Sequence, residues 1–172
     1  VNHKELFLCC SASDACQQFI ANSRRCGVPV FGLPAALATG DRLSRTACHA
    51  VVDRVTAALQ TDPRVILSVG LPPVSDRAVA GRLSAHLAKF TAEVLRASPV
   101  DHVYAEGGET AAALLTEMGW ERLLVKRELA PGVATLRPVG VRTQLTIKPG
   151  SYLWPGSVSQ VLARRRQQTQ AR

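Results

Sequence analysis

The chain has 172 residues, which is enough for one domain with a buried core. Its composition, 47% hydrophobic and 20% charged, excludes a disordered protein, and no apolar run reaches the roughly 20 residues needed to cross a bilayer. The net charge of +8 is concentrated in residues 164–172, which hold four of the 21 basic residues, and only 5% of residues are aromatic, so we expect neither a nucleic-acid nor a membrane partner.

The first predicted elements form a βαβ unit. Residues 5–10 are a short apolar run that predicts a strand. Residues 11–14 are small or acidic and can cap a helix, which we expect to run to about Cys26 because Gly27 can end it. Residues 28–31 then predict a second strand.

Helices and strands continue to alternate in the middle of the chain. Apolar residues recur at every fourth position over residues 43–59, the spacing of a core-facing helix, and residues 76–97 carry a second such stripe. Residues 64–69 and 102–105 predict strands, and residues 109–118 predict a short helix. This alternation predicts an α/β fold with a mainly parallel open sheet flanked by helices on both faces.

The pattern changes in the last third of the chain. Three β-type runs cover residues 122–129, 133–138 and 141–147, and turn residues separate them. They predict an antiparallel C-terminal extension of the sheet. A last helix begins near Gly156, so we expect one domain over residues 1–163 and a basic tail over residues 164–172. A solvated helix end explains the tail, and the remaining positive charge suits an anionic small ligand as well as a polymer.

The five cysteines include no CxxC motif, and none stands beside a histidine at metal-ligand spacing. Cys9 and Cys10 are adjacent on the first predicted strand, so their side chains point to opposite faces and cannot share a metal. We therefore expect no disulfide and no metal site, and buried thiols in a reducing cytoplasm. Because the chain opens at Val1 rather than Met and carries no secretory signal, we expect a cytoplasmic fragment of a longer protein.

The loop after the fourth predicted strand is the first candidate for a ligand site, because ligands bind beyond the carboxyl ends of the strands in an open parallel sheet. Gly107 and Gly108 precede a helix whose free N–H groups and positive dipole end can hold an anion. Thr110 could add a hydroxyl donor or cap the helix. The alternative is a tight strand-to-helix turn in which Glu109 complements the helix dipole.

Two other loops can contribute to the same site. Ser11 and Ser13 follow the first strand, where their hydroxyls can donate to phosphate oxygens or cap the next helix. Lys148 precedes the Gly150 turn after the last strand, and its ammonium can reach a phosphate as a point charge or remain solvated. The four histidines have neither triad nor metal spacing, so we assign no catalytic residue.

Several short motifs occur in a fixed order along nearly the whole chain: Cys10-Ser11-Ala12-Ser13 with Gln17-Gln18 downstream, Glu106-Gly107-Gly108-Glu109-Thr110, Ala130-Pro131-Gly132-Val133 and Lys148-Pro149-Gly150-Ser151-Tyr152. No single motif is specific, but the ordered set resembles the C-terminal nucleotide-binding domain of the four-carbon acid sugar kinases.

The resemblance implies an ATP-dependent kinase that phosphorylates a hydroxyl of a four-carbon sugar acid such as threonate or erythronate. It implies that Mg²⁺ bridges the phosphates and that an N-terminal domain, absent here, binds the acceptor and could hold the catalytic base. A homo-oligomer is left open. The residues that it places around ATP or ADP are Ser11, Ser13, Gly107, Gly108, Glu109, Thr110, Lys148, Gly150 and Ser151.

The chain departs from the family pattern at two places. The family often has Ser-Gly-Ser where this chain has Cys9-Cys10-Ser11, and often Gly-Gly-Phe-Gly where this chain has Gly150-Ser151-Tyr152-Leu153. Each change adds side chains beside the expected nucleotide, which fits an altered ligand or a loss of turnover. A non-catalytic nucleotide- or metabolite-binding module is the alternative function, and a nucleic-acid or protein-interaction domain is the third.

Overall fold

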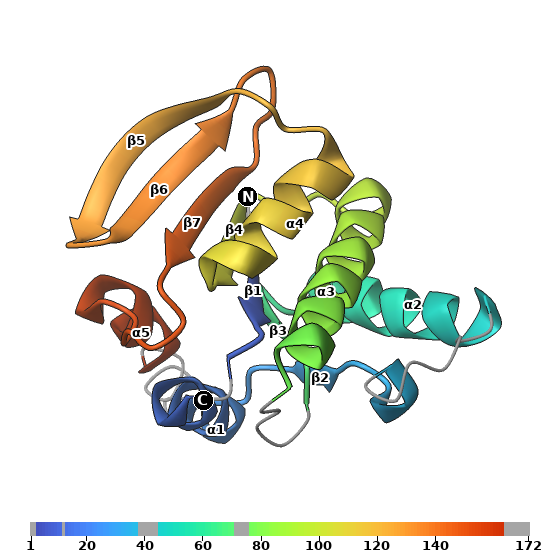
Figure 1. Cartoon of the computed structure of the whole chain (residues 1–172). Helices are drawn as coiled ribbons and strands as arrows, with labels where there is room; N and C mark the ends of the chain where they lie inside the picture. The colour runs from blue at the N-terminus through green and yellow to red at the C-terminus, as the bar shows by residue number, and fades with distance from the viewer. Residues whose placement is uncertain (1–2, 12, 38–44, 71–75, 164–172) are drawn as a thin grey trace.

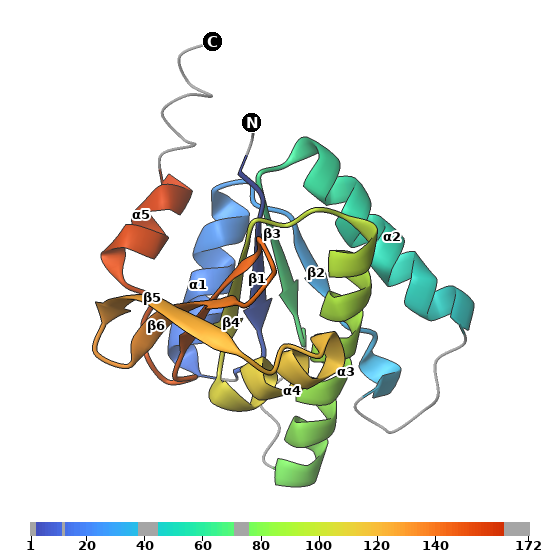
Figure 2. The same cartoon turned by 90° about the horizontal axis from the view of Figure 1, so that it is seen from above.

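The computed structural model describes residues 3–11, 13–37, 45–70 and 76–163, so the predicted tail over residues 164–172 lies outside the described residues. The described chain forms one seven-stranded sheet with helices on both faces (Figures 1 and 2). In chain order the elements are β1 (Glu5–Cys9), α1 (Asp14–Arg25), β2 (Val30–Gly32), η1 (Ala35–Leu37), α2 (Arg45–Thr61), β3 (Arg64–Ser68), α3 (Arg77–Ala97), β4 (His102–Glu106), α4 (Gly108–Met118), β5 (Leu123–Ala130), β6 (Val133–Pro138), β7 (Gln144–Lys148) and α5 (Gly156–Ala163).

The strand order in the sheet is β2-β3-β1-β4-β7-β6-β5. The predicted parallel part is confirmed, since β1 pairs in parallel with β3 and β4, and β2 with β3. The prediction of a wholly antiparallel extension is wrong for β7. This strand is antiparallel to β6 but parallel to β4, because it inserts between them and continues the central sheet. The carboxyl end of β7 therefore lies at the same edge as those of β1, β3 and β4.

The core is divided in two by the sheet, because successive side chains of a strand point to opposite faces. On one face Leu6 and Leu8 of β1 belong to a cluster with α2, α3 and α4, and on the other Phe7 and Cys9 belong to a cluster with α1 and α5. Burial from both sides explains why the central strands are continuous apolar runs rather than alternating ones. None of the described helices is both long and apolar enough to cross a membrane.

The predicted helical stripes face the core as expected. In α2 the stripe is buried at Val51, Val55 and Leu59, while residue 43 lies outside the described residues. In α3 the buried members include Leu83 and Leu87. Each helix thus packs one apolar side against the sheet and leaves the other for solvent.

Local hydrogen bonds set where several elements begin and end. The Asp76 carboxylate accepts the N–H groups of Ala78 and Val79 and caps α3. Gly119 ends α4 with φ +64°, a left-handed conformation that glycine adopts without strain. The last strand begins at Gln144, three residues later than predicted, because Val141 donates its N–H to Pro138 in a turn instead of joining the sheet.

Candidate functional site

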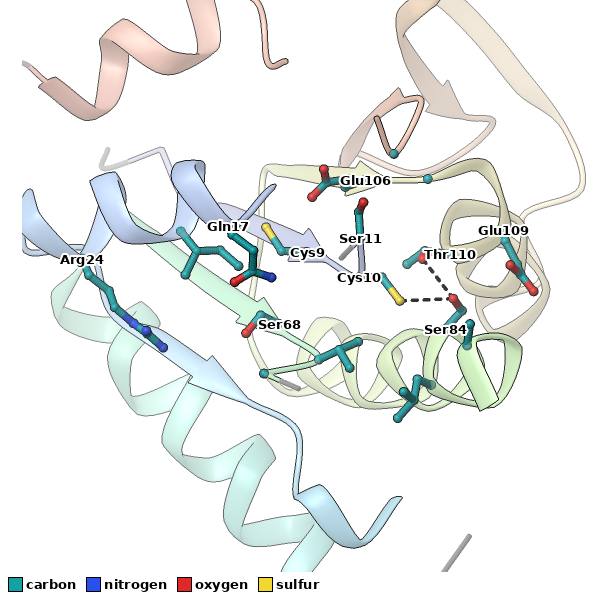
Figure 3. A pocket seen from close by; sticks show the side chains of 17 residues that line it. Cys9, Cys10, Ser11, Gln17, Arg24, Ser68, Ser84, Glu106, Glu109 and Thr110 are labelled. Atoms are coloured by element: carbon teal, nitrogen blue, oxygen red, sulfur yellow. Dashed lines mark hydrogen bonds between the residues drawn. The ribbon is translucent and has the colours of Figure 1, made fainter. Parts of the chain in front are cut away.

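A pocket of about 640 Å³ opens beyond the carboxyl ends of β1, β3 and β4, between α1 and α3 (Figure 3). This is the edge at which ligands bind in open parallel sheets. Strand ends and following loops supply most of its wall, and α1, α3 and the start of α4 supply the rest. The lining residues are Cys9, Cys10, Ser11, Gln17, Ile20, Arg24, Ser68, Val69, Gly70, Ala80, Leu83, Ser84, Glu106, Gly107, Glu109, Thr110 and Gly150.

The start of α4 forms one wall of this pocket. Gly107 has φ +94° and ψ 133°, a backbone conformation that side chains disfavour, and it stands at the N-cap without a capping side chain. Its N–H donates to the carbonyl of Lys148 (2.8 Å), which fixes the loops after β4 and β7 to each other. A Cβ on Gly108 would meet nothing within 4 Å. The helix therefore presents an uncapped, open N-terminus beside the pocket, where an anion is favoured.

Thr110 and Cys10 lie together at the α3 side of the pocket. The Thr110 hydroxyl donates to Ser84 Oγ (3.5 Å), and Ser84 Oγ lies 3.2 Å from Cys10 Sγ, as Figure 3 shows. Burial raises the pKa of the Cys10 thiol, and the hydrogen bonds to Ser84 and Thr110 partly oppose the shift. Cys10 is therefore a poor nucleophile here and is better suited to shaping the pocket.

The two serines of the first loop differ in position. Ser11 lines the pocket, and its Oγ accepts the N–H of Ser13 (3.1 Å). Ser13 lies behind the pocket wall and caps α1, because its Oγ accepts the N–H of Cys16 (3.2 Å). The same hydroxyl donates to the carbonyl of Gly150 (3.1 Å), so the cap also fixes the loop after β7. A Cβ on Gly150 would lie 3.5 Å from Ser11 Oγ, an ordinary contact that leaves little free space.

Lys148 is buried rather than solvated. It is 1% exposed and lies beside Glu106 on β4, its cross-strand neighbour, with 2.5 Å between Nζ and Oε1. Its Nζ also donates to the carbonyls of Pro149 (3.1 Å) and Gly150 (3.4 Å), and it stands 5.1 Å from the centre of the Trp154 ring. The ammonium therefore neutralises a carboxylate of the pocket wall and holds the loop that follows β7.

The structure brings most of the predicted residues to one place. Five line the pocket, two stand directly behind it, one lies at the open helix start, and Ser151 is exposed in the turn after β7. The five lining residues are Ser11, Gly107, Glu109, Thr110 and Gly150; the two behind are Ser13 and Lys148; the helix start is Gly108.

Sequence reasoning named Gln17 only as part of an ordered motif and did not place α1 in the site. Gln17, Ile20 and Arg24 line the pocket, and Figure 3 shows Arg24 opposite Glu109 across it. Their spacing of three and four residues places them on one side of the helix, which was the signal available in the sequence. Arg24 is an exposed cation on the pocket rim, whereas Glu106 and Glu109 bring negative charge.

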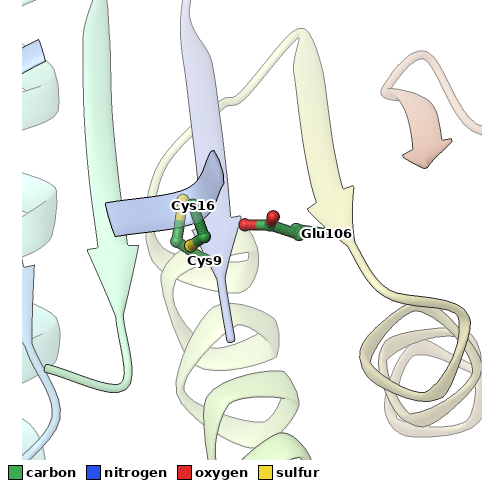
Figure 4. Close-up of side chains that lie close together, drawn as sticks. All are labelled: Cys9, Cys16 and Glu106. Carbon is green, nitrogen blue, oxygen red and sulfur yellow. The ribbon is translucent and has the colours of Figure 1, made fainter. Parts of the chain in front are cut away.

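Sequence reasoning also treated the cysteines singly. Cys9, Cys16 and Glu106 meet in the structure, with one ligand atom of each within 4.8 Å of the others (Figure 4). The hydrogen bond with Cys16 and burial raise the pKa of the Cys9 thiol well above its ordinary value. Both thiols are free and buried, as expected, but no pattern in the sequence indicated that they lie side by side.

The sequence matches the family model described as the nucleotide-binding C-terminal domain over residues 6–152. No curated protein matches the chain. Similar solved structures include a domain of unknown function (DUF1537) from Bordetella bronchiseptica, a domain-swapped dimer with bound citrate, with 19% identity and a TM-score of 0.72 over 95% of this chain and 41% of that one. A Haemophilus influenzae protein of DUF1537 has 19% identity and a TM-score of 0.72 over 95% of this chain and 40% of that one.

A third structure, a Salmonella typhimurium LT2 protein described provisionally as a tRNA synthase, has 17% identity and a TM-score of 0.71 over 96% of this chain and 41% of that one. At these identities the likeness shows a shared fold. The chain spans about two fifths of the length of these neighbours.

Proposed function

Because the chain belongs to the family of nucleotide-binding C-terminal domains, we propose that it is the nucleotide-binding part of an ATP-dependent kinase for a four-carbon sugar acid of the threonate or erythronate type. The observation that carries the proposal is the uncapped N-terminus of α4 at the wall of a large pocket on the carboxyl edge of the sheet. The sugar-acid class comes from the ordered motifs of the sequence, and the acceptor would be held by another domain.

The proposed phosphate site is built around Gly107, Gly108 and Thr110. Backbone N–H groups of the first turn of α4 would donate to phosphate oxygens, and the helix dipole would favour their negative charge. Ser11 and Gly150 would line the site beside α4, and Ser13 and Lys148 would hold the loop that contains Gly150, while Ser151 in the same turn stays a predicted contact. Phosphoryl transfer depends mainly on positioning and charge neutralisation, which such a site supplies.

Mg²⁺ fits the oxygen donors of this wall. The Glu109 carboxylate lies at the first turn of α4, and Ser11 and Thr110 line the same pocket with their hydroxyls. Mg²⁺ prefers oxygen ligands and keeps several waters, so one carboxylate together with nucleotide phosphates is a sufficient set. When bound, the ion would neutralise phosphate charge, and it would offset the repulsion between Glu109 and an anionic nucleotide. Arg24 on the facing helix would act as a second positive group.

A direct binding experiment tests this proposal. Calorimetry with ATP, ADP and adenosine, with and without Mg²⁺, should show tighter binding of the phosphorylated ligands, because the site recognises phosphate. A short DNA duplex at two salt concentrations serves as the contrast. A salt-steep duplex signal without nucleotide binding would favour a nucleic-acid domain and would overturn the proposal.

The second candidate is a nucleotide- or metabolite-binding module without catalysis. It is favoured by Cys10, which places a thiol and its contact with Ser84 in the pocket where the related kinases often have glycine. ATP binding that never supports phosphoryl transfer, even when the chain is joined to an acceptor-binding domain, would select this candidate.

A homo-oligomer is part of the proposal. The edge strand β5 leaves Leu124 and Val125 exposed, with exposed fractions of 46% and 75%, and such an edge is suited to pairing with another chain. The Bordetella bronchiseptica neighbour is a domain-swapped dimer. Light scattering of the purified chain should give twice the monomer mass. Val125→Lys places a charge on the edge strand and should lower the measured mass toward that of the monomer.

A further inference from the structure

Two cysteines and a glutamate meet beside the pocket floor. Cys9 ends β1, Cys16 lies in the first turn of α1, and Glu106 ends the neighbouring strand β4 (Figure 4). The ligand atoms of all three lie within 4.8 Å of one another, and all three residues are buried. Sulfur ligands of a tetrahedral zinc ion stand about 3.7 Å apart, so a small inward movement would bring these atoms to coordination distance.

We propose that Cys9, Cys16 and Glu106 form a site for a thiophilic divalent cation, with Zn²⁺ as the best fit. Two sulfur ligands favour zinc over the oxygen-preferring Mg²⁺, so this site is distinct from the magnesium position proposed at Glu109. The site does not depend on whether the domain binds a nucleotide.

Glu106 provides an independent indication of a missing partner. Its Oε1 is paired with Lys148, but its Oε2 is buried and has no hydrogen-bond partner among the described residues. A buried carboxylate oxygen without a partner is costly, and native proteins rarely leave one so. Figure 4 shows the carboxylate directed toward the two cysteines. A cation bound there would supply the partner that the protein itself does not.

The charges of the site also balance when the cation is bound. Two thiolates and a carboxylate carry three negative charges, a divalent cation offsets two, and the adjacent Lys148 ammonium offsets the third. Without the cation, two neutral thiols and the Glu106–Lys148 pair are balanced as well. Binding of one cation would therefore release the two thiol protons. The net charge of the buried site would stay the same, which matters because a buried net charge is costly.

The described residues supply three ligands, which would leave a fourth position open. Cys9 and Glu106 both line the pocket, so water or a ligand atom in it can reach the cation. Three protein ligands and one open position are the arrangement that zinc adopts where it meets a substrate or solvent. A ligand bound in the pocket could thus coordinate the cation directly.

Cobalt titration under reducing conditions tests the site. The chain is first treated with a chelator, then titrated with Co²⁺, whose thiolate complexes absorb in the near ultraviolet, and the Co²⁺ is displaced with Zn²⁺. We expect one equivalent of Co²⁺ with a thiolate band, complete displacement by Zn²⁺, and a rise in the melting temperature with Zn²⁺. No thiolate band, or a band that Mg²⁺ removes as readily as Zn²⁺, would overturn the proposal.

Variants locate the ion. Cys16→Ala and Cys9→Ser should each weaken Co²⁺ binding at least tenfold and remove or reduce the thiolate band, whereas Glu106→Gln should weaken binding and keep the band. Cys48→Ala, a half-buried cysteine on α2, is the matched control and should bind like the unchanged chain. Circular dichroism identifies variants that fold, and Cys16→Ala, which only shortens a small side chain, is the safest of them. A full band in folded Cys16→Ala would place the metal elsewhere and refute the site.

Discussion

At the scale of single residues, Gly108 gives the sharpest test of the proposed anion site. Its φ is not positive and a Cβ would meet nothing within 4 Å, so the fold itself does not require glycine there. The open space lies where an anion would approach the N-terminus of α4. A side chain at this position would thus act on the ligand rather than on the fold.

Gly108→Val should weaken ADP binding by about 1 kcal/mol or more while leaving the melting temperature nearly unchanged, because the new side chain fills the approach to the helix amides. Calorimetry and thermal denaturation measure the two effects. Ala112→Val, on an exposed position of the same helix, is the control and should leave ADP affinity as it was. A large fall in melting temperature with unchanged affinity would instead favour the simple tight turn.

Lys148 requires a paired experiment, because Lys148→Met alone leaves Glu106 charged, buried and unpaired. That single change should lower the free energy of unfolding by about 3 to 5 kcal/mol. The double variant Glu106→Gln with Lys148→Met removes both charges and should recover much of this stability in urea unfolding. Equal stability of the single and double variants would argue against a strong ion pair.

The same double variant tests the predicted contact of Lys148 with the nucleotide. If the ammonium reaches the phosphates, ATP should lose about 1.5 to 3 kcal/mol of binding free energy and adenosine almost none. Lys89→Met, at an exposed position of α3, is the control and should change neither the affinity for ATP nor that for adenosine. If ATP and adenosine lost equal binding free energy, Lys148 would not contact the phosphates, and the backbone N–H groups of α4 alone would recognise them.

His102 makes folding depend on pH. Burial lowers its pKa to about 4, with smaller contributions from His3 and Arg127, and its Nε2 lies 2.7 Å from Thr146 Oγ1. The unfolded chain binds this proton near pH 6.5, so stability should fall as pH decreases from about 6.5 to 4, by about 3 kcal/mol at most. Urea unfolding at pH 7 and pH 4 should show that His102→Gln loses less stability between the two pH values than the unchanged chain does. His49→Gln, at an exposed site, should keep the original pH dependence.

At the scale of elements, α1 and the loop after β7 are joined through one hydroxyl. Ser13 Oγ accepts from the first turn of α1 and donates to the carbonyl of Gly150, and Lys148 Nζ donates to the same carbonyl. The loop that closes the pocket is therefore held by a helix cap and by a buried ion pair. Neither group needs to touch a ligand to affect its binding.

Ser13→Ala should lower the free energy of unfolding by about 1 kcal/mol through loss of the cap, and should also weaken ADP binding because the Gly150 loop loses an anchor. Asp76→Ala removes the cap of α3, a carboxylate that accepts from Ala78 and Val79, and should reduce stability without weakening ADP binding. Denaturation and calorimetry on both variants separate the two effects. Equal ADP affinities in the two variants would show that the loop does not need this anchor.

At the scale of the whole molecule, the chain supplies one side of the proposed reaction. It spans about two fifths of the neighbours of the same fold, and the pocket described here is the proposed donor site. Phosphoryl transfer requires donor and acceptor to be aligned. We expect the chain alone to give no appreciable phosphorylation of threonate or erythronate in a coupled ADP assay, and rapid turnover would contradict the proposed division of roles.

The sequence by itself determined the local elements and the class of the fold. Periodicity placed the helices, because a helix on a sheet must bury one side, and turn residues separated the strands. It also indicated Gly107 to Thr110 and the Ser11 loop as parts of one site, since the carboxyl ends of parallel strands share an edge. The ordered motifs also indicated a nucleotide-binding C-terminal domain, which the match over residues 6–152 confirms, whereas the four-carbon acid sugar as substrate class stays a prediction.

Only the tertiary structure decided which distant groups meet. β7 pairs with β4 through hydrogen bonds between segments about 40 residues apart, and no local pattern states that it inserts there rather than at the edge of the sheet. This pairing places Lys148 beside Glu106, so the lysine that was expected to reach a phosphate or remain solvated forms a buried ion pair. Likewise, the packing of α1 on β1 brings Cys16 to Cys9, because side-chain neighbours across elements are fixed by packing and not by sequence spacing.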